Sequence, residues 1–428
     1  MNAGRRVCVA LLLGVISWLA QGQARAATEI VLVLDNSCSM VNESEYGGET
    51  IPPADPDRLS VLATLILTEL RDPNDSFHIL NFNGNGKEEP QWRSLPVGKD
   101  SIRGIDYDSM TLFRGVTAEA NRILRSSKEE RRLLVFVTDG MPSERLTPGE
   151  LRGILGERPP FDVLAIGVNR SRQILEAQEA YLGELTRGVG TYFQVTDPAE
   201  LVTRFTKAYA AQLGSKPFPD PEAGAGAALL KPGSARDVRV GKYVRELLVV
   251  ATTTDRSGPF GATLLRGTKP VVPSDEGDSG CVVPPGVRYV GSLARSCEPP
   301  HDHYKVWKVP NDPGKASNWR LTVDSGAMSP VAFGFILRYE LGAEVLAAPA
   351  RARVGETIPI EARINYRGQT FDDEEFFESD GFEAWAVLGE QRVLLKRGDD
   401  SLFRGALRAE QRGVRDLQVL FSNRWMEL

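Results

Sequence analysis

The chain has 428 residues, of which 42% are hydrophobic and 25% charged, a composition typical of globular proteins and long enough for roughly two to four packed domains. Its formal net charge of −6 comes from 51 basic and 57 acidic residues, without long runs of either sign. This composition excludes a disordered or fibrous chain, and the charge argues against binding to nucleic acid or to an anionic membrane surface.

The first 26 residues have the three parts of a secretion signal. MNAGRR is basic, VCVALLLGVISWLA is apolar, and Ala24, Arg25 and Ala26 form a small-x-small cleavage site, so we expect the mature chain to begin at Ala27. A buried or membrane-spanning helix is the alternative, but this apolar run is short for a hydrocarbon layer of ~30 Å, and no other segment approaches ~18 consecutive apolar residues. The sequence therefore predicts an exported protein, which is periplasmic, in the cell envelope or secreted, with no membrane anchor unless one follows Leu428.

Residues 28–213 alternate short apolar runs with amphipathic stretches, the pattern of a parallel β-sheet covered by helices. Apolar residues spaced three and four apart predict the first helix, and Asp55 and Asp57 suit its start. We expect strands at 29–34, 77–82, 132–137, 161–168 and 191–195, and helices at 57–70, 112–124, 174–185 and from 199. This layout is a doubly wound, Rossmann-like α/β domain.

Proline, glycine and alanine are concentrated in residues 214–234, which we interpret as a linker. Beyond it, strand-sized apolar runs with frequent turn residues and few helical faces predict two all-β domains. The first is a β-sandwich over residues 235–341, and the second is a smaller, immunoglobulin-like β-sandwich over residues 342–428.

The four cysteines fit an oxidising compartment. Cys8 leaves with the signal, and Cys281 and Cys297 bracket a Pro/Gly-rich loop that a disulfide would close, with a stabilisation of about 3 kcal/mol. Two unpaired buried thiols are the alternative to this disulfide. Cys38 is left over in either case.

The end of the first predicted strand carries three oxygen-bearing side chains, Asp35, Ser37 and Ser39, in the pattern D-x-S-x-S. Thr111 lies just before a predicted helix, and Asp139 follows another apolar strand. In open α/β sheets ligands bind at the carboxyl edge of the strands, where these residues are expected. Carboxylate and hydroxyl oxygens are hard ligands, suited to Mg²⁺, Mn²⁺ or Ca²⁺.

These residues resemble the metal-ion-dependent adhesion site of the von Willebrand factor A family, in which D-x-S-x-S, a distant threonine and a strand-end aspartate bind one divalent ion. The resemblance covers residues 28–213. It implies that Ser37, Ser39 and Thr111 contact the ion directly or through water, with Asp35 and Asp139 as acidic anchors. It also implies that an Asp or Glu carboxylate of a protein partner completes the coordination.

Each residue also has a structural interpretation. Asp35 and Ser37 would form an Asx turn, Thr111 a helix N-cap, and Asp139 a turn with the glycine that follows. Cys38 departs from the glycine usual between the two serines. A thiol beside a dication could become a reactive thiolate or invite Zn²⁺, but no Lys, Arg or His lies near it in sequence to lower its pKa, so a spectator thiol is favoured.

Other polar clusters carry less information. His301 and His303 flank Asp302 without an obvious third ligand, so a solvated loop is favoured over a metal site. The acidic run over residues 372–380 is also interpreted as a solvated loop, since it lacks the ordered spacing of a Ca²⁺-binding loop.

An enzyme is disfavoured by the residues present. The chain has three histidines, none beside a nucleophile-elbow sequence, and no phosphate-binding P-loop or dinucleotide fingerprint. We therefore expect an exported, non-enzymatic binding protein that presents a metal to a protein partner, with no nucleic-acid ligand, and with membrane association only through a partner or an anchor outside this sequence. A structural subunit of a cell-envelope assembly is the alternative, and a hydrolase that uses metal-bound water is the third possibility.

Overall fold

The structure of the protein is a computed structural model, which describes residues 27–46, 49–55, 58–84, 90–140, 142–168, 172–212, 229–253, 260–277, 304–312, 314–349, 351–378, 381–410 and 417–423. The secretion signal, the two cysteines of the expected disulfide, and both histidines of the 301–303 cluster lie outside these residues. Those expectations stay predictions.

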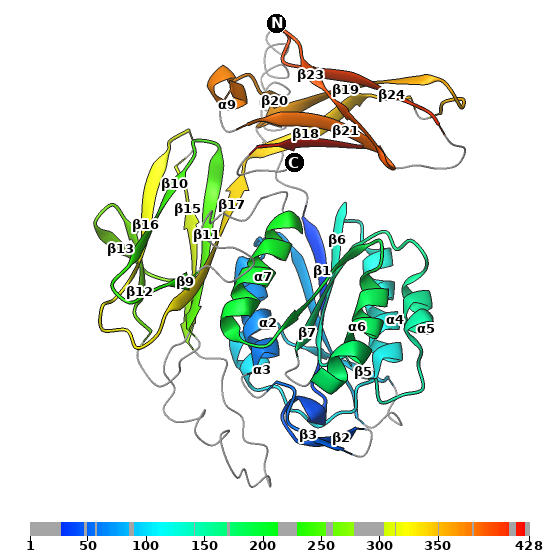
Figure 1. Ribbon diagram of the computed structural model, residues 1–428, viewed down its shortest axis with the longest axis vertical. Helices are drawn as coiled ribbons and strands as arrows, with labels where there is room; N and C mark the ends of the chain where they lie inside the picture. Colours follow the sequence, from blue (N-terminus) through cyan, green and yellow to red (C-terminus); the bar gives the residue numbers. More distant parts are fainter. Residues whose placement is uncertain are drawn as a thin grey trace, which may run out of the picture. The chain divides into compact units, whose positions relative to one another are not determined.

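A six-stranded sheet forms the centre of the N-terminal part (Figure 1). Four neighbouring pairs are parallel, and only β5 runs antiparallel, at one edge. The predicted α/β region with a parallel sheet is confirmed, whereas the edge strand β5 was not predicted. In spatial order the strands are β5 (Trp92–Leu95), β4 (Ser76–Phe82), β1 (Thr28–Leu34), β6 (Arg131–Thr138), β7 (Asp162–Val168) and β8 (Gly190–Val195).

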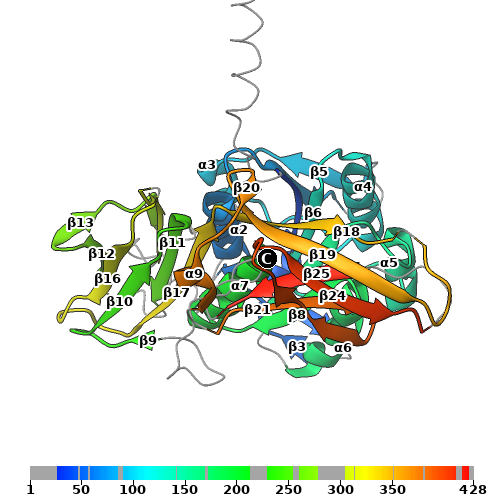
Figure 2. The same cartoon turned by 90° about the horizontal axis from the view of Figure 1, so that it is seen from above.

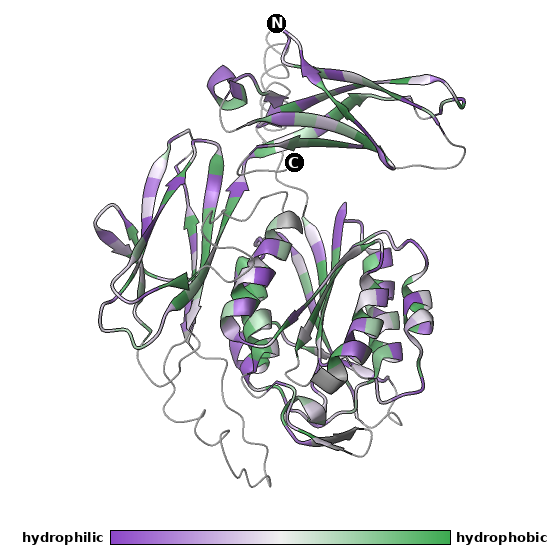
Figure 3. Cartoon of the chain, viewed as in Figure 1, coloured by the Kyte–Doolittle hydropathy of each residue, from purple (hydrophilic) through white to green (hydrophobic). Residues whose placement is uncertain are grey.

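Helices cover both faces of this sheet because β1 and β6 are apolar on both sides. Ile30, Leu32 and Leu34 enter the core beneath α2 and α7, and Val31 and Val33 enter the core beneath α4, α5 and α6. Figure 3 shows that these helices carry both apolar and hydrophilic residues, as expected for helices that pack one side against a sheet. The helices are α2 (Leu59–Leu70), α3 (Lys99–Arg103), α4 (Phe113–Ser126), α5 (Pro148–Leu155), α6 (Arg172–Thr186) and α7 (Pro198–Gln212).

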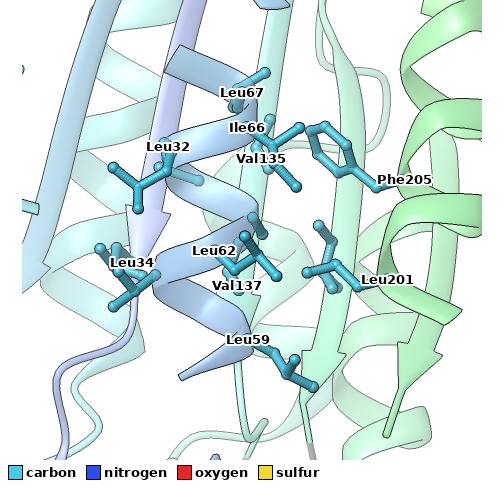
Figure 4. Close-up of a cluster of buried hydrophobic side chains, with 14 of the residues drawn as sticks. Leu32, Leu34, Leu59, Leu62, Ile66, Leu67, Val135, Val137, Leu201 and Phe205 are labelled. Carbon is cyan, nitrogen blue, oxygen red and sulfur yellow. The ribbon is translucent and has the colours of Figure 1, made fainter. Parts of the chain in front are cut away.

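The core beneath α2 and α7 is built from leucine, isoleucine, valine and phenylalanine side chains. Figure 4 shows members of this layer from β1, α2, β6 and α7: Leu32, Leu34, Leu59, Leu62, Ile66, Leu67, Val135, Val137, Leu201 and Phe205.

Helix boundaries differ from the sequence prediction where capping decides them. The first helix was predicted from residue 57, but α2 begins at Leu59, because the Asp55 carboxylate accepts hydrogen bonds from the backbone of Leu59 (2.5 Å) and Ser60 (2.9 Å). Helix α5 was not predicted, although Thr147 and Glu150 form a capping box at its start.

Two antiparallel sheets follow residue 228. One sheet has the order β10-β16-β12-β13 and the other the order β14-β15-β11-β17-β9. The strands are β9 (Leu229–Leu230), β10 (Ala235–Val240), β11 (Val244–Thr253), β12 (Ala262–Arg266), β13 (Lys269–Val271), β14 (Asp275–Gly277), β15 (Tyr304–Pro310), β16 (Ser317–Val323) and β17 (Val331–Tyr339).

The five-stranded antiparallel sheet packs directly on α2 and α7 of the α/β region. Leu248, Val250, Val306 and Ile336 belong to the same buried cluster as the side chains of those two helices. Figure 2 shows β11 and β17 beside α2 and α7. We call this contact the seam. Because the core is continuous across it, Ala27–Leu213 and Pro217–Arg338 form one compact unit, so the interval predicted as an interdomain linker, residues 214–234, separates two parts that share one core.

Tyr339–Leu428 belong to a second compact unit. The sequence division was placed at residue 342, whereas the units divide between Arg338 and Tyr339 and the first strand of the second unit begins at Leu341. Its sheets have the orders β18-β19-β24-β23 and β22-β21-β25, with β20 beside β19. The elements are β18 (Leu341–Ala347), β19 (Thr357–Tyr366), β20 (Gln369–Thr370), α9 (Glu374–Glu378), β21 (Glu383–Leu388), β22 (Gln391–Leu394), β23 (Lys396–Arg397), β24 (Phe403–Arg408) and β25 (Leu417–Ser422).

A phenylalanine cluster lies within this second unit. Phe377 of α9 contacts Phe382 and Phe403, with ring centroids 5.0 Å and 5.5 Å away, and Phe403 contacts Phe421 of β25 at 5.0 Å. The acidic run at 372–380 was interpreted as a solvated loop, and that interpretation is wrong for α9. Its glutamates are exposed, but its two phenylalanines pack inward.

Candidate functional site

The first predicted segment of the site leaves the sheet at the carboxyl end of β1. The backbone N–H of Asp35 donates to the carbonyl of Val137 at 2.9 Å, which continues the pairing of β1 with β6. One carboxylate oxygen of Asp35 accepts from the N–H of Ser37 at 2.7 Å. This is the Asx turn expected as a structural role, and the other carboxylate oxygen is left for a second interaction. A short 3₁₀ turn, Cys38–Met40, follows.

Four of the five predicted site residues form one hydrogen-bonded network. The hydroxyl oxygens of Ser37 and Ser39 are 3.0 Å apart, and the Ser39 hydroxyl donates to a carboxylate oxygen of Asp139 at 2.5 Å. Asp139 directly follows β6. The hydroxyl of Thr138, the last residue of β6, donates to the second carboxylate oxygen of Asp35. Residues about a hundred positions apart in the chain thus meet at one edge of the sheet.

Thr111 lies beside this network without joining it. Its side chain is buried, with 2% of the residue exposed, and in the described part of the chain it makes no hydrogen bond to the other four residues. Its carbonyl accepts from the backbone N–H of Ser143 at 2.9 Å, and its own N–H donates to the Ser143 hydroxyl at 3.2 Å. The N-cap of α4 is Leu112, so Thr111 is not the cap that its structural interpretation required. Its role toward an ion stays a prediction.

The electrostatics of Asp35 are unusual for a carboxylate. The residue is fully buried, and this burial raises its pKa, while hydrogen bonds from Ser37 and Thr138 oppose the shift. These donors are neutral, so they compensate a negative charge only in part. A cation beside this buried carboxylate would therefore stabilise its negatively charged form.

The donor set fits a hard divalent ion. Two carboxylates and two serine hydroxyls supply only oxygen, and the 3.0 Å separation of the hydroxyls is close to the ~2.9 Å expected between neighbouring ligands of an octahedron with 2.0–2.1 Å bonds. Among the described residues, no group of three or more His, Cys, Asp or Glu side chains gathers as a metal site. A site in this region therefore depends on the serine hydroxyls as well as on the two aspartates.

Cys38 is an exposed, free cysteine. Desolvation and the negative charge of Asp108 raise the pKa of its thiol, which donates to the carbonyl of Tyr107 at 3.4 Å. A raised pKa keeps the sulfur protonated, so the structure favours the spectator thiol over the reactive thiolate.

Several supporting residues were missed by the sequence analysis. The side chain of Asn36 accepts from the N–H of Phe82 at 2.9 Å and donates to Ser109 at 3.2 Å, and the backbone of Ser109 pairs with that of Ser37. These bonds hold the segment before Thr111 against the D-x-S-x-S loop. A polar residue at the variable position of a motif gives no signal by itself, because most such side chains face solvent.

A second connection leads from the loop to α2. The carbonyls of Ser39 and Met40 accept from the backbone N–H groups of Ala54 (3.0 Å) and Asp55 (2.8 Å). Asp55, predicted as a starting residue of this helix, then caps α2 through Leu59 and Ser60. Asp57, the other starting residue predicted there, lies outside the described residues. The loop and the helix are therefore held as one piece.

Comparisons with known proteins give the following similarities. No family model matches the chain, and no curated protein matches it. Among solved structures it is similar to von Willebrand factor type A from Catenulispora acidiphila, with 14% identity and a TM-score of 0.32 over 90% of this chain and 67% of that one. It is also similar to three N-terminal domains of the type V pili tip protein Mfa5 from Porphyromonas gingivalis, with 8% identity and a TM-score of 0.30 over 93% of this chain and 90% of that one.

An aerotolerance-related membrane protein from Bacteroides fragilis is similar over 40% of this chain and 92% of its own length, with 16% identity and a TM-score of 0.29. The neighbours thus include a von Willebrand factor A protein, while the fold assignment rests on the strand order and helix layers described above. In the described part of this chain, no helix has the length and apolar character needed to cross a membrane.

Proposed function

We propose that this chain is an exported, non-enzymatic binding protein. In this proposal its α/β region is a von Willebrand factor A-like domain that presents Mg²⁺ or Mn²⁺ to an Asp or Glu side chain of a protein partner. The single observation that supports it best is the network of Asp35, Ser37, Ser39 and Asp139 at the carboxyl ends of β1 and β6. Asp35 and Asp139 would anchor the ion, with the serine hydroxyls and Thr111 as further ligands.

The mixture of ligands decides what such an ion can do. When bound, the ion supplies a positive centre that attracts a carboxylate from outside. The protein's part is to hold the two serine hydroxyls 3.0 Å apart and to keep Asp35 buried. Hydroxyls neutralise less of the charge than carboxylates would, so an acidic partner still gains from binding.

The described histidine supports a binding protein over a hydrolase. His78 lies on β4 opposite Val31, and its ring nitrogen is 2.9 Å from the Glu29 carboxylate. Both of these β1 residues lie well before the carboxyl end of the strand, where the loop begins. His78 therefore has a partner away from the loop edge. His301 and His303 lie outside the described residues.

A structural subunit of an envelope assembly is the second candidate. The seam favours it, because the antiparallel sheet is part of the same compact unit as the α/β region instead of a separate stalk. In this version the ion only stabilises the loop edge. The antiparallel sheets, which we propose to be immunoglobulin-like β-sandwiches, would then supply the surfaces for association.

Metal titration of the purified chain tests the first proposal. We expect calorimetry to show one Mn²⁺ or Mg²⁺ bound by the wild type, and none by Asp35→Ala or Asp139→Ala. Asp237→Ala is a matched control, because Asp237 is an exposed strand aspartate paired with Arg320 at 2.6 Å. A wild type that binds no divalent ion contradicts the proposal.

Partner capture separates the two candidates. The wild type, Asp35→Ala and Asp237→Ala are immobilised and exposed to envelope extract with and without a chelator. Capture that is lost with chelator and with Asp35→Ala supports presentation of a metal to the partner. Capture that survives both treatments supports the structural subunit, and turnover of a substrate that stops with chelator would support the hydrolase.

A further inference from the structure

We infer that Gln178 of α6 is a positioning residue for the metal site: its side-chain amide holds the end of β6, and thereby orients Thr138 and Asp139 toward the loop that follows β1. The inference rests on the proposed function, because it concerns the geometry of the same site. It adds a residue that lies on another element and touches none of the proposed ligands' side-chain oxygens.

The contacts of Gln178 are directed at the strand end. The residue is completely buried. Its amide nitrogen donates to the backbone carbonyl of Asp139 at 2.9 Å and to that of Thr138 at 3.3 Å. Its amide oxygen accepts from the hydroxyl of Tyr192 at 3.4 Å, so the amide is held from both sides. Burial raises the pKa of Tyr192 to about 12, which keeps that hydroxyl protonated as a donor at neutral pH.

Two glycines make room for this side chain. A Cβ at Gly140 would lie 2.5 Å from Cγ of Gln178, and one at Gly167 would lie 2.6 Å from its Cδ. Gly140 directly follows Asp139, and Gly167 pairs with Thr138 across the β6–β7 ladder. Gly140 also has a φ of +83°, which favours glycine. The amide therefore lies against bare backbone at the ends of two neighbouring strands.

An amide suits this position because the carbonyls of Thr138 and Asp139 lie where the sheet ends. Buried carbonyls need donors, and a side chain of the same shape without N–H groups would leave these two without this bond. With the carbonyls bound to Gln178, the Thr138 hydroxyl accepts from the N–H of Gly140 at 2.9 Å and donates to Asp35. Asp139 keeps its carboxylate on Ser39.

The position of Gln178 in α6 also indicates a role other than packing. It occupies the buried stripe of the helix with Leu182 and Leu185, at spacings of four and seven. An apolar side chain is the usual choice at such a place. Burying a glutamine there costs free energy unless its amide is bonded, and both bonds that its amide nitrogen donates go to the end of β6, beside the metal site.

Two variants test the role. Gln178→Met keeps length and flexibility but removes the amide donor, and Tyr192→Phe removes only the hydroxyl that orients the amide. We expect Gln178→Met to weaken Mn²⁺ binding by about 10- to 100-fold, the range typical when a residue that orients a ligand is lost. Tyr192→Phe is expected to weaken it less. Gln391→Met, on β22 of the second compact unit, serves as the glutamine control and should leave the dissociation constant unchanged.

The readout separates positioning from stability. Calorimetry gives the Mn²⁺ dissociation constant, and thermal unfolding in chelator gives the stability of the metal-free fold. A residue that only packs would lower the unfolding temperature in chelator and leave the dissociation constant of the folded protein as in the wild type, which overturns the inference. If Gln178→Met does not fold, an unchanged dissociation constant in Tyr192→Phe overturns it instead. Absence of Mn²⁺ binding by the wild type contradicts the proposed function itself and is thereby distinguished.

Discussion

The two ends of α2 make a useful comparison, because both are polar and buried but they are compensated differently. At the seam, the buried Arg338 is 2.6 Å from Glu246 and the buried Asp72 is 2.5 Å from Arg245, so each of these two buried charges has an opposite charge within the chain. At the loop edge, the donors that hold Asp35 are neutral. The difference teaches where to look for a function: charges compensated within the chain hold the fold, and a buried carboxylate without such compensation suits a cation from outside.

The seam also satisfies the helix end itself. The last carbonyls of an α-helix have no partner within the helix and carry partial negative charge. Arg338 donates to the carbonyl of Leu70, and Lys308 donates to that of Arg71 at 2.6 Å. Both cations come from the antiparallel sheet. The sheet therefore provides the C-terminal cap of α2, while Asp55 provides the N-terminal one.

The largest effect is expected from Arg338→Ala, which removes the charge compensation at the C-terminal end of α2. It leaves the partly buried carboxylate of Glu246 and the buried carbonyl of Leu70 without their cation, and the free energy of unfolding should fall by about 3–5 kcal/mol. Urea unfolding measures this loss of free energy, and hydrogen exchange of the β11 amides reports whether it arises at the seam. Arg320→Ala is the control, since that arginine is exposed and solvent screens its ion pair with Asp237, so the variant should lose little stability. Equal losses in the two variants would show that the seam is no more than a surface contact.

Addition of metal tests the other end of α2, where the Asp35 loop should stabilise the fold only when an ion is bound. At a Mn²⁺ concentration about 100-fold above its dissociation constant, the wild type should gain about 2.7 kcal/mol in unfolding free energy, because only the folded state has the site. Asp35→Ala should gain nothing, and Arg338→Ala should gain as much as the wild type does. The measurement is urea unfolding with Mn²⁺ and with chelator. A full gain in Asp35→Ala would place the ion elsewhere.

The sequence predicted the loop edge better than the seam, for a physical reason. Asp35, Ser37, Ser39 and Asp139 follow apolar strands, and parallel strands bring their carboxyl ends to one edge, so strand assignment alone placed them together. The seam joins the apolar faces of α7 and β11. The sequence pattern of each element shows that it has an apolar face but does not show which other element packs against that face. The composition of residues 214–234 suggested a linker at a domain boundary, and it gave no sign that the parts on either side of it share one core.

The supporting residues of the site escaped prediction for a similar reason. Gln178 was one polar residue in a helix of alternating polar and apolar side chains, and its burial depends on Gly140 and Gly167 from two strands. Only the interruption of the stripe that contains Leu182 and Leu185 could have indicated it. Thr111 is the reverse case, since the family resemblance singled it out and no described bond joins it to the network.

A smaller effect is expected where the seam is tight for steric reasons. A Cβ at Gly334 of β17 would lie 2.6 Å from the Thr206 side chain of α7, so Gly334→Ala should cost about 1–3 kcal/mol by overpacking. The double variant with Thr206→Ala should recover part of that loss, which a thermodynamic cycle measures. Gly183→Ala is the control, because nothing lies within 4 Å of its Cβ position and a helical glycine gains about 0.5–1 kcal/mol on this change. Additive losses in the cycle would argue against close packing of α7 on β17.

The smallest effect is expected from pH, at Asp72. Burial alone would raise the pKa of this carboxyl, but a hydrogen bond from the backbone of Asn74 and the charges of Arg245 and Arg338 hold it below its ordinary value of 3.8. A lowered folded-state pKa contributes stability that is present above 3.8 and lost as the pH falls through the folded-state value. Asp72→Asn should therefore cost on the order of 1 kcal/mol more at pH 6 than near pH 2.5, measured by urea unfolding in chelator. A cost that does not change with pH would mean that Asp72 acts at the seam through shape and hydrogen bonding, with no net contribution from its charge.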